Sequence, residues 1–237
     1  MGVERVKTYI HNFDDYIQGG VPKGHVILIS GTPGTMKSSV CYSILYNNAK
    51  NNGVRSVYMT LEQSKENLLQ QMELMGMNDP KVQEMVYVLD LATIRKNVTE
   101  MMAKGSWLQV FKMYAETVKK DLGFDLLVLD SLDVLEMAAQ LTNDRRNDLF
   151  YLFMWLRGMN ITSFLIAETP VDNINGGRFE EGYLADGVIS LKLQNIGETD
   201  VQRRIRAVKL RSTNHKTGYF SLMFSDGMFR ATQVINE

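Results

Sequence analysis

The sequence predicts a three-layer α/β domain, with a mostly parallel central sheet flanked by helices and antiparallel hairpins at its C-terminal end. Two observations predict this class. First, short apolar runs of strand length alternate with longer amphipathic segments through most of the 237 residues. Second, the apolar runs are nearly continuous, as in strands that are covered on both faces. After about Gly182 strand-like runs follow one another with only turns between them, which predicts hairpins.

Five apolar runs are expected to be the parallel strands. Amphipathic segments separate them, so right-handed crossovers should join each strand to the next. The five runs are His25–Ser30, Arg55–Thr60, Met85–Leu91, Asp125–Asp130 and Ile161–Ala167. Three later runs should form the hairpins that extend or flank the sheet, and these are Asp186–Gln194, Arg203–Arg211 and Tyr219–Ser225.

Four amphipathic segments are expected to be helices, and their ends carry capping signals. Ser64 can cap the second helix, and Asn67 stands where a capping box would place Glu or Gln. The third ends with two lysines and then Gly123, which is a typical C-terminal signal. The expected helices are Met36–Asn52, Ser64–Met77, Ser106–Leu122 and Asn143–Arg157.

The composition is that of a soluble globular protein, with 45% hydrophobic and 22% charged residues. Cys41 is the only cysteine, so the core must hold without a disulfide. The 26 basic and 27 acidic residues give a net charge of -1, so any polyanion must be bound by a local site. No export signal or membrane-spanning run is visible. We therefore expect one cytoplasmic domain over residues 1–237.

A candidate phosphate loop lies between the first expected strand and the first expected helix. The segment GTPGTMKS matches G-x-x-x-x-G-K-[ST] at Gly31, Lys37 and Ser38, but Met36 replaces the second glycine. In such a loop backbone N–H groups surround phosphate oxygens, the lysine balances the terminal phosphates, and the hydroxyl ligates Mg²⁺. The helix N-terminus adds unpaired N–H groups and its dipole. The expected binding residues are Gly31, Thr32, Pro33, Gly34, Thr35, Met36, Lys37, Ser38 and Ser39.

Met36 is the residue that departs from this motif. A residue with a Cβ atom loses about 1–2 kcal/mol if the loop requires a left-handed conformation there. Either Met36 is right-handed, or the affinity for nucleotide is altered. A chance glycine-rich turn is the alternative explanation, but the strand-turn-helix context and Gly34 inside the loop favour a phosphate site.

Two carboxylates follow expected strands and are candidates for the same site. Asp130 closes the run LLVLD, where α/β NTPases present a carboxylate to the Mg²⁺ shell. Glu62 follows the second strand and could act as a general base on a water near the γ-phosphate, with Gln63 orienting that water. The alternatives are a loop anchor or helix cap for Asp130 and a first-turn acid of the next helix for Glu62.

Together these features resemble a single KaiC-type domain of the RecA superfamily. Besides the phosphate loop, Glu62 and the VLDS strand end, the resemblance rests on KLRSTNH at Lys209–His215, FDDYIQGGVPKG at Phe13–Gly24 and EGYLADGVISL at Glu181–Leu191. It covers about Phe13 to Phe229. The resemblance implies a RecA-like P-loop NTPase fold, with ATP and Mg²⁺ as ligands and ATP hydrolysis as the activity.

In KaiC-type domains ATP lies between neighbouring subunits of a ring, usually a hexamer. The family segment K-x-R-x-[ST]-x-H reaches the neighbour's phosphates, and here it falls on Lys209, Arg211, Thr213 and His215. On a strand Lys209 and Arg211 share one face, so they could stabilise the transition-state charge in trans. Alternatively both are solvated charges on an edge strand, and His215 is simply exposed.

Three departures from the family pattern carry information. The chain has the length of one such domain, whereas KaiC clock proteins carry two in tandem. The loop Pro170–Gly182 contains no serine or threonine, which excludes the self-phosphorylation that the second clock domain performs there. Finally, Gln63 follows Glu62 where the family usually has a second glutamate, so hydrolysis could be slow.

Two functions are compatible with the phosphate site. A ring-forming ATPase would convert nucleotide state into conformational change, and Glu62 with the intact pair Lys209 and Arg211 favours it. A nucleotide-sensing module would use ATP occupancy to control assembly, like the related subunit at the base of the archaeal motility motor. Met36 and Gln63 favour this second function. The protein client is unknown in either case.

A recombinase-like DNA-binding protein is a third hypothesis, which the charge pattern disfavours. The loop Pro170–Gly182, which would grip DNA, offers one basic residue, Arg178, against three acidic ones. Binding to a polyanion requires several cationic contacts. The cluster Arg203, Arg204 and Arg206 lacks aromatic partners for base stacking, so solvated strand or subunit contacts are preferred. We expect neither nucleic acid nor membrane as a partner.

Overall fold

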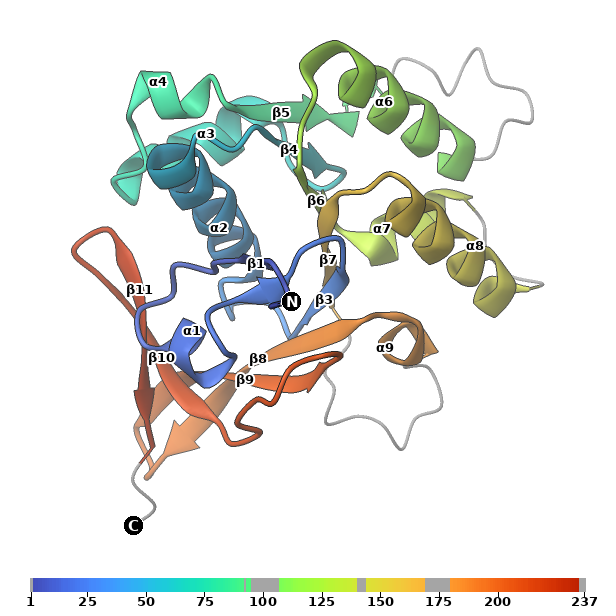
Figure 1. Cartoon of the computed structure of the whole chain (residues 1–237). Coiled ribbons are helices and arrows are strands. Elements are labelled where there is room, and N and C mark those ends of the chain that lie inside the picture. Colours follow the sequence, from blue (N-terminus) through green and yellow to red (C-terminus); the bar gives the residue numbers. More distant parts are fainter. Residues whose placement is uncertain (1, 92, 95–106, 140–143, 169–179, 235–237) are drawn as a thin grey trace.

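The computed structural model describes residues 2–91, 93–94, 107–139, 144–168 and 180–234. Its centre is a nine-stranded sheet with the strand order β11-β10-β9-β8-β3-β7-β6-β4-β5 (Figure 1). The parallel part consists of β3 (Val26–Ser30), β4 (Ser56–Thr60), β5 (Val86–Asp90), β6 (Leu126–Asp130), β7 (Thr162–Ala167) and β8 (Gly187–Ile196). All residues of β3, β4, β6 and β7 are buried, as their continuous apolar runs predict.

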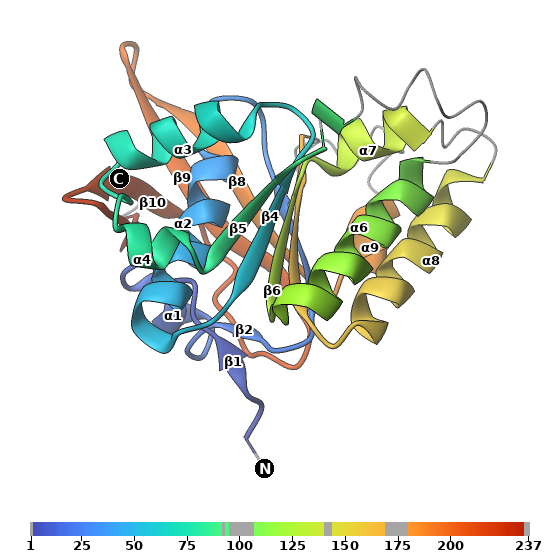
Figure 2. The same ribbon diagram turned by 90° about the horizontal axis from the view of Figure 1, so that it is seen from above.

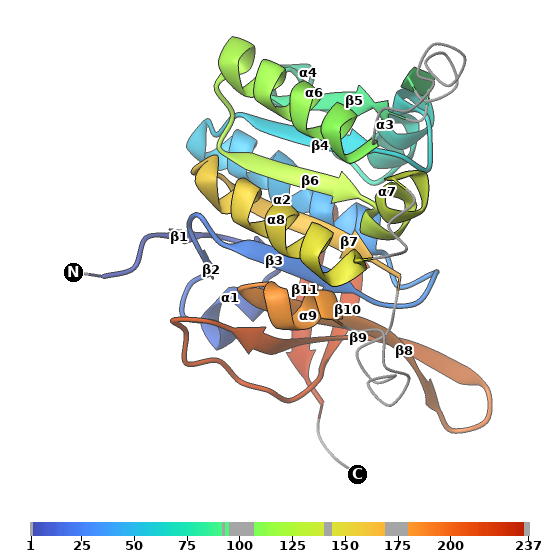
Figure 3. The same ribbon diagram turned by 90° about the vertical axis from the view of Figure 1, so that its right-hand side faces the viewer.

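Helices cover both faces of the parallel part and make three layers (Figures 2 and 3). One layer packs its apolar side chains into a core with one face of the sheet, and it contains α2 (Lys37–Asn52), α3 (Lys65–Leu74) and α4 (Pro80–Gln83). The other layer packs on the second face and contains α6 (Trp107–Leu122), α7 (Leu132–Ala139), α8 (Arg145–Gly158) and α9 (Glu180–Leu184). The expected three-layer arrangement is therefore present.

The last strands extend the same sheet in antiparallel fashion. They are β9 (Asp200–Leu210), β10 (Phe220–Ser225) and β11 (Met228–Gln233). The preceding strand β8 belongs to both parts, because it is parallel to β3 and antiparallel to β9. The expected C-terminal hairpins thus join the central sheet through β8.

A small N-terminal unit packs beside this extension. It contains β1 (Arg5–Val6), α1 (Phe13–Tyr16) and β2 (Val21–Pro22), with β1 and β2 paired antiparallel. The ring of Tyr16 stacks on that of Phe220 at a centroid distance of 4.1 Å. Phe13 is fully buried and contacts Phe220 edge-on. These contacts fix the N-terminal segment against β10.

The expected helix boundaries need three corrections. The first helix begins at Lys37 and not at Met36, which is its N-cap residue. The second ends at Leu74 and not at Met77, while Ser64 caps it as expected by accepting a hydrogen bond from the Asn67 N–H at 3.3 Å. The fourth begins at Arg145, with Asp144 as its N-cap residue, and it extends to Gly158 instead of ending at Arg157. The first residue expected in the third helix, Ser106, lies outside the described ranges.

Candidate functional site

The segment Gly31–Ser38 wraps the N-terminus of α2, at the carboxyl end of β3. The hydroxyl of Thr35 donates to the carbonyl of Thr32 at 2.7 Å, and the Lys37 ammonium donates to the same carbonyl at 3.2 Å. Gly31 is required here, because a Cβ atom at this position would lie 2.3 Å from the carbonyl oxygen of Leu191. These contacts hold the turn in a compact loop, in which the Lys37 ammonium lies against the loop backbone.

Met36 adopts the left-handed conformation, with φ 70° and ψ 30°. Of the two possibilities that the sequence left open, a right-handed Met36 is therefore wrong. The loop keeps the backbone geometry that a glycine would adopt freely, and the Cβ atom makes this conformation costly. The Met36 side chain is half-buried and packs against the core on the α2 side of the sheet.

Asp130 ends β6 and is almost completely buried. It accepts hydrogen bonds from the hydroxyl of Tyr58 on β4, at 2.5 Å, and from the hydroxyl of Ser38 at the start of α2. Burial raises the pKa of Asp130, and these two hydrogen bonds partly oppose that rise. The structure thus brings the expected carboxylate and the expected hydroxyl of the phosphate loop into direct contact.

Glu62 lies just beyond β4, and its carboxylate is held from the neighbouring strand end. Ser131, the residue after β6, donates its hydroxyl to Glu62 Oε1 at 2.5 Å. The backbone N–H of Gln63 donates to the Thr60 hydroxyl at 3.2 Å, and this hydroxyl donates to the Gln63 carbonyl at 2.9 Å. The turn after β4 is therefore ordered by local hydrogen bonds, and it leaves Glu62 exposed to solvent.

These groups line one cavity of about 350 Å³ at the carboxyl edge of the parallel strands. The residues around it come from the phosphate loop, from the turn after β4, from α3 through Gln71, and from the ends of β6 and β7. Those that the sequence singled out are Pro33, Gly34, Met36, Lys37, Ser38, Ser39, Glu62, Gln63 and Asp130.

Sequence reasoning missed two residues of this region. Glu168 follows β7 and lines the cavity, and burial together with the neighbouring charge of Glu62 raises its pKa. Its place directly after an expected strand was the same signal that identified Glu62. The second residue is Arg203 on β9, whose guanidinium Nε donates to the carbonyl of Gly34 at 3.2 Å. No sequence signal pairs these two positions.

Lys209 and Arg211 lie far along the sheet from the phosphate loop of the same chain. Leu210 pairs with Gly187 on β8, and Gly187 pairs with Ile27 near the start of β3. Gly31 follows the end of β3, about 13 Å further along the strand at 3.3 Å per residue. The two cations therefore flank the amino end of β3, and the phosphate loop lies at its carboxyl end.

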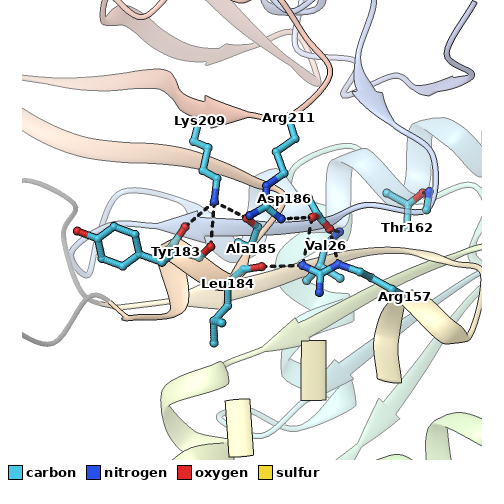
Figure 4. A network of polar contacts seen from close by, with 11 residues as sticks. Val26, Arg157, Thr162, Tyr183, Leu184, Ala185, Asp186, Lys209 and Arg211 are labelled. Carbon is cyan, nitrogen blue, oxygen red and sulfur yellow. Dashed lines mark hydrogen bonds and ion pairs between the residues drawn. The ribbon is translucent and has the colours of Figure 1, made fainter. Parts of the chain in front are cut away.

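Both cations are engaged in a local polar network (Figure 4). The Lys209 ammonium donates to the carbonyls of Gly182, Tyr183 and Ala185 at 3.1, 3.1 and 2.6 Å. Arg211 donates to the Asp186 carboxylate at 2.7 Å. Burial, followed by the nearby charge of Arg211, lowers the pKa of Lys209.

Asp186 is the centre of this network, because Arg157 on α8 binds it as well. The Arg157 guanidinium donates to both Asp186 oxygens, at 2.9 and 3.1 Å. Burial tends to raise the pKa of Asp186, but hydrogen bonds from Arg157, from the Val26 N–H and from Arg211 outweigh it, and the pKa is lowered. Half of the Arg211 side chain remains exposed, so this residue is partly available to a ligand from outside the chain.

Thr213 and His215 follow in the loop after β9. The Thr213 hydroxyl accepts from the Arg5 guanidinium at 3.0 Å, which ties this loop to the N-terminal segment. His215 contacts the carbonyl of its neighbour Lys216 at 3.4 Å. The structure places neither residue in the cavity around the phosphate loop.

Most of the loop Pro170–Gly182 lies outside the described residues, so the predictions on self-phosphorylation and DNA binding there are not tested. Within the described ranges, no helix has the length and apolar character that a bilayer crossing requires. Among the same residues no three histidine, cysteine or acidic side chains cluster as a metal site.

Comparisons with known proteins agree with this architecture. A protein-family model described as "ATPase: KaiC" matches residues 6–229. A UPF0273 protein of Aeropyrum pernix is 30% identical over 224 residues, which cover 90% of this chain and 87% of the relative. The circadian clock oscillator protein KaiC of Nostoc is 25% identical over 259 residues, which cover 98% of this chain but only 46% of the clock protein. The chain thus spans less than half of that relative.

A solved structure is similar over nearly the whole chain. The crystal structure of a KaiC-like protein from the hyperthermophilic archaeon Pyrococcus horikoshii matches with a TM-score of 0.82 and 26% sequence identity. The match covers 98% of this chain and 100% of the other. The expected fold class, a mostly parallel sheet with antiparallel C-terminal strands, is confirmed.

Proposed function

This chain belongs to the KaiC family of ATPases, and on that premise we propose that it binds ATP with Mg²⁺ at the phosphate loop and hydrolyses it slowly. We propose further that copies of the chain assemble into a ring, in which each nucleotide lies between two subunits. Residues 1–237 would act as one domain of this assembly.

One observation carries the proposal of ATP binding. Lys37, Ser38, Asp130 and Glu62, which lie up to 93 positions apart in the sequence, converge on a single cavity of about 350 Å³. The three parts that phosphoryl transfer requires are a cation for the terminal phosphates, oxygen ligands for a divalent cation and a base for the attacking water. The cavity contains a candidate for each.

The groups around Ser38 fit Mg²⁺. Mg²⁺ prefers oxygen ligands, keeps several waters and uses few protein groups besides the phosphates. The Ser38 hydroxyl and the Asp130 carboxylate are hydrogen-bonded neighbours, and the Tyr58 hydroxyl fixes the carboxylate by donating to Asp130 Oδ2. Mg²⁺ would neutralise developing charge on the phosphates. Ser38 would be its direct ligand, and Asp130 would hold the ligand shell.

Glu62 is the proposed general base. Its carboxylate would accept a proton from the water that attacks the γ-phosphorus, while Lys37 balances the charge on the γ-phosphate oxygens. Ser131 orients the Glu62 carboxylate through its hydrogen bond. The neutral Gln63 contributes no second carboxylate, so a slow turnover is expected.

Arg211 and Lys209 are proposed to act on the nucleotide of a neighbouring subunit, with Thr213 and His215 beside them. Their place at the opposite end of β3 from their own phosphate loop supports a role in trans. Arg211 is the stronger candidate of the pair, because half of its side chain is exposed and Asp186 holds its guanidinium in a fixed position. Lys209 would first have to leave three carbonyl partners.

The test is to measure ATP binding and hydrolysis in matched variants. K37A should abolish ATP binding, whereas E62Q should retain binding and lose at least about 100-fold in turnover. E66Q is the control, since Glu66 lies one turn further along the same segment on the exposed side of α3. Wild-type turnover in E62Q would contradict the proposed base.

A nucleotide-sensing module is the second candidate, and the left-handed Met36 favours it. A strained loop is stabilised by a ligand that fits it, so ATP would act chiefly on the conformation and assembly of the chain. If E62Q assembles with ATP to the same extent as the wild type, turnover is incidental and this second function is the correct one. If assembly persists only while ATP is hydrolysed, the first function holds.

A further inference from the structure

A second cavity lies in the antiparallel part of the sheet, away from the phosphate loop. Its volume is about 470 Å³, and β8, β9, the loop before β10 and the end of β11 surround it. Among the described residues that line it none is acidic, and three are cationic. The polar lining consists of Lys192, Gln194, Arg204, Lys216 and Gln233, and the aromatic lining consists of Tyr219 and Phe220.

Strand register places the key side chains on one face of the sheet. Lys192 on β8 is directly opposite Arg204 on β9, and Arg204 is directly opposite Ser221 on β10. The alternate residues, such as Leu191 and Ile205, point into the core with α2. The cavity therefore lies on the other side of the sheet from that core.

Arg204 is the central observation. Only 7% of its surface is exposed, although it lines the cavity. Within the described ranges its guanidinium has no hydrogen bond, ion pair or ring contact. The guanidinium nitrogens are not fully buried, because Arg204 lines the cavity and reaches solvent there, and an anion in the cavity could pair with this charge.

A tyrosine gathers further positive charge beside the cavity. The ring of Tyr219 lies between other cations of the cluster, with Lys192 Nζ 4.1 Å and Arg206 Cζ 4.4 Å from its centroid. The tyrosine ring thus packs against two positively charged side chains close to the cavity.

We propose that this cavity is a second anion site, which binds a small phosphate-bearing molecule with Arg204 as its principal contact. The planar guanidinium can donate two parallel hydrogen bonds to a phosphate group, and Lys192 and Lys216 add two point charges. Three cations suit a multiply charged phosphate better than a single carboxylate. The site does not depend on the function proposed for the phosphate loop.

Calorimetric titration of inorganic pyrophosphate tests this proposal in Mg²⁺-free buffer. The K37A variant serves as the background, so that the phosphate loop does not contribute. We expect K37A to bind pyrophosphate, and K37A/R204Q to bind it about tenfold more weakly or worse, because a charge-assisted contact is lost. K37A/R55Q is the matched control, with the same charge change at an exposed arginine, and its affinity should be unchanged.

Two additional arms keep the test decisive. Lys216 is exposed, so K216Q should fold normally and weaken binding even if R204Q does not fold. Tricarballylate, a tricarboxylate, should bind more weakly than pyrophosphate. Equal affinities for these two anions would overturn the proposal. So would pyrophosphate binding by both the R204Q and the K216Q variants that is as tight as binding by K37A. Loss of pyrophosphate binding in K37A itself would do the same, since it would place the anion at the phosphate loop.

Discussion

At the scale of single residues, Met36 shows that the phosphate loop keeps its backbone geometry although the glycine of the motif is missing. Its left-handed φ of 70° is the conformation that glycine would supply without a steric cost. The half-buried side chain packs on the core beside α2 and recovers part of that cost through buried apolar contacts. Backbone strain and side-chain packing therefore act in opposite directions at this position.

Two variants separate these effects. M36A and M36G both lose the packing of the methionine side chain, but only M36G also relieves the backbone. We expect M36G to be more stable than M36A by about 0.5–1 kcal/mol, since the relief exceeds the entropy that glycine loses on folding. Urea unfolding without nucleotide measures the difference. If M36A were the more stable variant, the left-handed conformation of residue 36 would be wrong.

The buried pair Tyr58 and Asp130 gives a second residue-scale prediction. Y58F removes the hydroxyl that donates to Asp130 and leaves a buried carboxylate with one partner fewer, so stability should fall by about 1.5–3 kcal/mol. Y42F is the control, because the Tyr42 hydroxyl is buried with no partner among the described residues. Y42F should be neutral or slightly stabilising in the same urea unfolding measurement.

The effect of Y58F should also depend on pH in a defined direction. Burial raises the pKa of Asp130, and the Tyr58 hydrogen bond opposes this rise because it stabilises the charged carboxylate. Removing the hydroxyl therefore penalises the charged form. The stability difference between Y58F and the wild type should be largest near neutral pH and should shrink as the pH falls through the raised pKa of Asp130. A difference that grows toward acidic pH would contradict this assignment.

The residues also show what a sequence can predict about a site. Lys37, Ser38 and Asp130 were predictable because a strand end and a helix start fix their positions relative to each other. Glu168 follows the same rule, yet an acid after a strand is too common a feature to be singled out by itself. The contact of Arg203 with Gly34 depends on the pairing of distant strands, which no local pattern encodes.

At the scale of elements, the long buried strands and long helices were predicted well, and the short or composite ones were not. Helix α7 was not predicted, because it has only eight residues and its apolar positions follow the apolar run of β6 after a single residue. Strand β11 was missed because polar residues interrupt its apolar positions, so its sequence MFRATQ contains no continuous apolar run. The parallel pairing of β8 with β3 was also missed, since a strand followed by hairpins carries no sign of its other neighbour.

Helix α9 offers a prediction at this scale, because Lys209 satisfies the carbonyls at its C-terminal end. K209M keeps the aliphatic stem but leaves these carbonyls without their donor, so the ATP-free protein should lose about 1–3 kcal/mol of stability. K23M is the control, since Lys23 forms only an exposed ion pair with Glu4 and should have little effect. Thermal unfolding compares the two variants. If K209M is as stable as K23M, the Lys209 hydrogen bonds do not stabilise the ATP-free protein, and Lys209 would act only on a bound ligand.

At the scale of the whole molecule, the sheet separates the two halves of the proposed nucleotide site. The phosphate loop, Asp130 and Glu62 lie at the carboxyl edge of the parallel strands, while Arg211 lies at the amino end of β3. A chain built in this way cannot complete the proposed site alone. A head-to-tail contact between identical chains would bring the two halves together, and such contacts form a ring when the rotation between neighbouring subunits closes.

Mixing two inactive variants tests this arrangement. E62Q lacks the base but supplies Arg211, whereas R211A supplies the base but lacks the trans cation, so each alone should hydrolyse ATP at least about tenfold more slowly than the wild type. In rings assembled from equal amounts of both, about a quarter of the sites combine an intact Glu62 with an intact Arg211 from the neighbour, and activity should recover to about a quarter of the wild-type rate.

Turnover and the assembly mass with ATP and Mg²⁺ are measured together, with R146A in place of R211A as a control that should not lose activity. A strictly monomeric wild type, or an unchanged rate in R211A, would contradict a site shared between subunits, because each active site would then have to be complete within one chain.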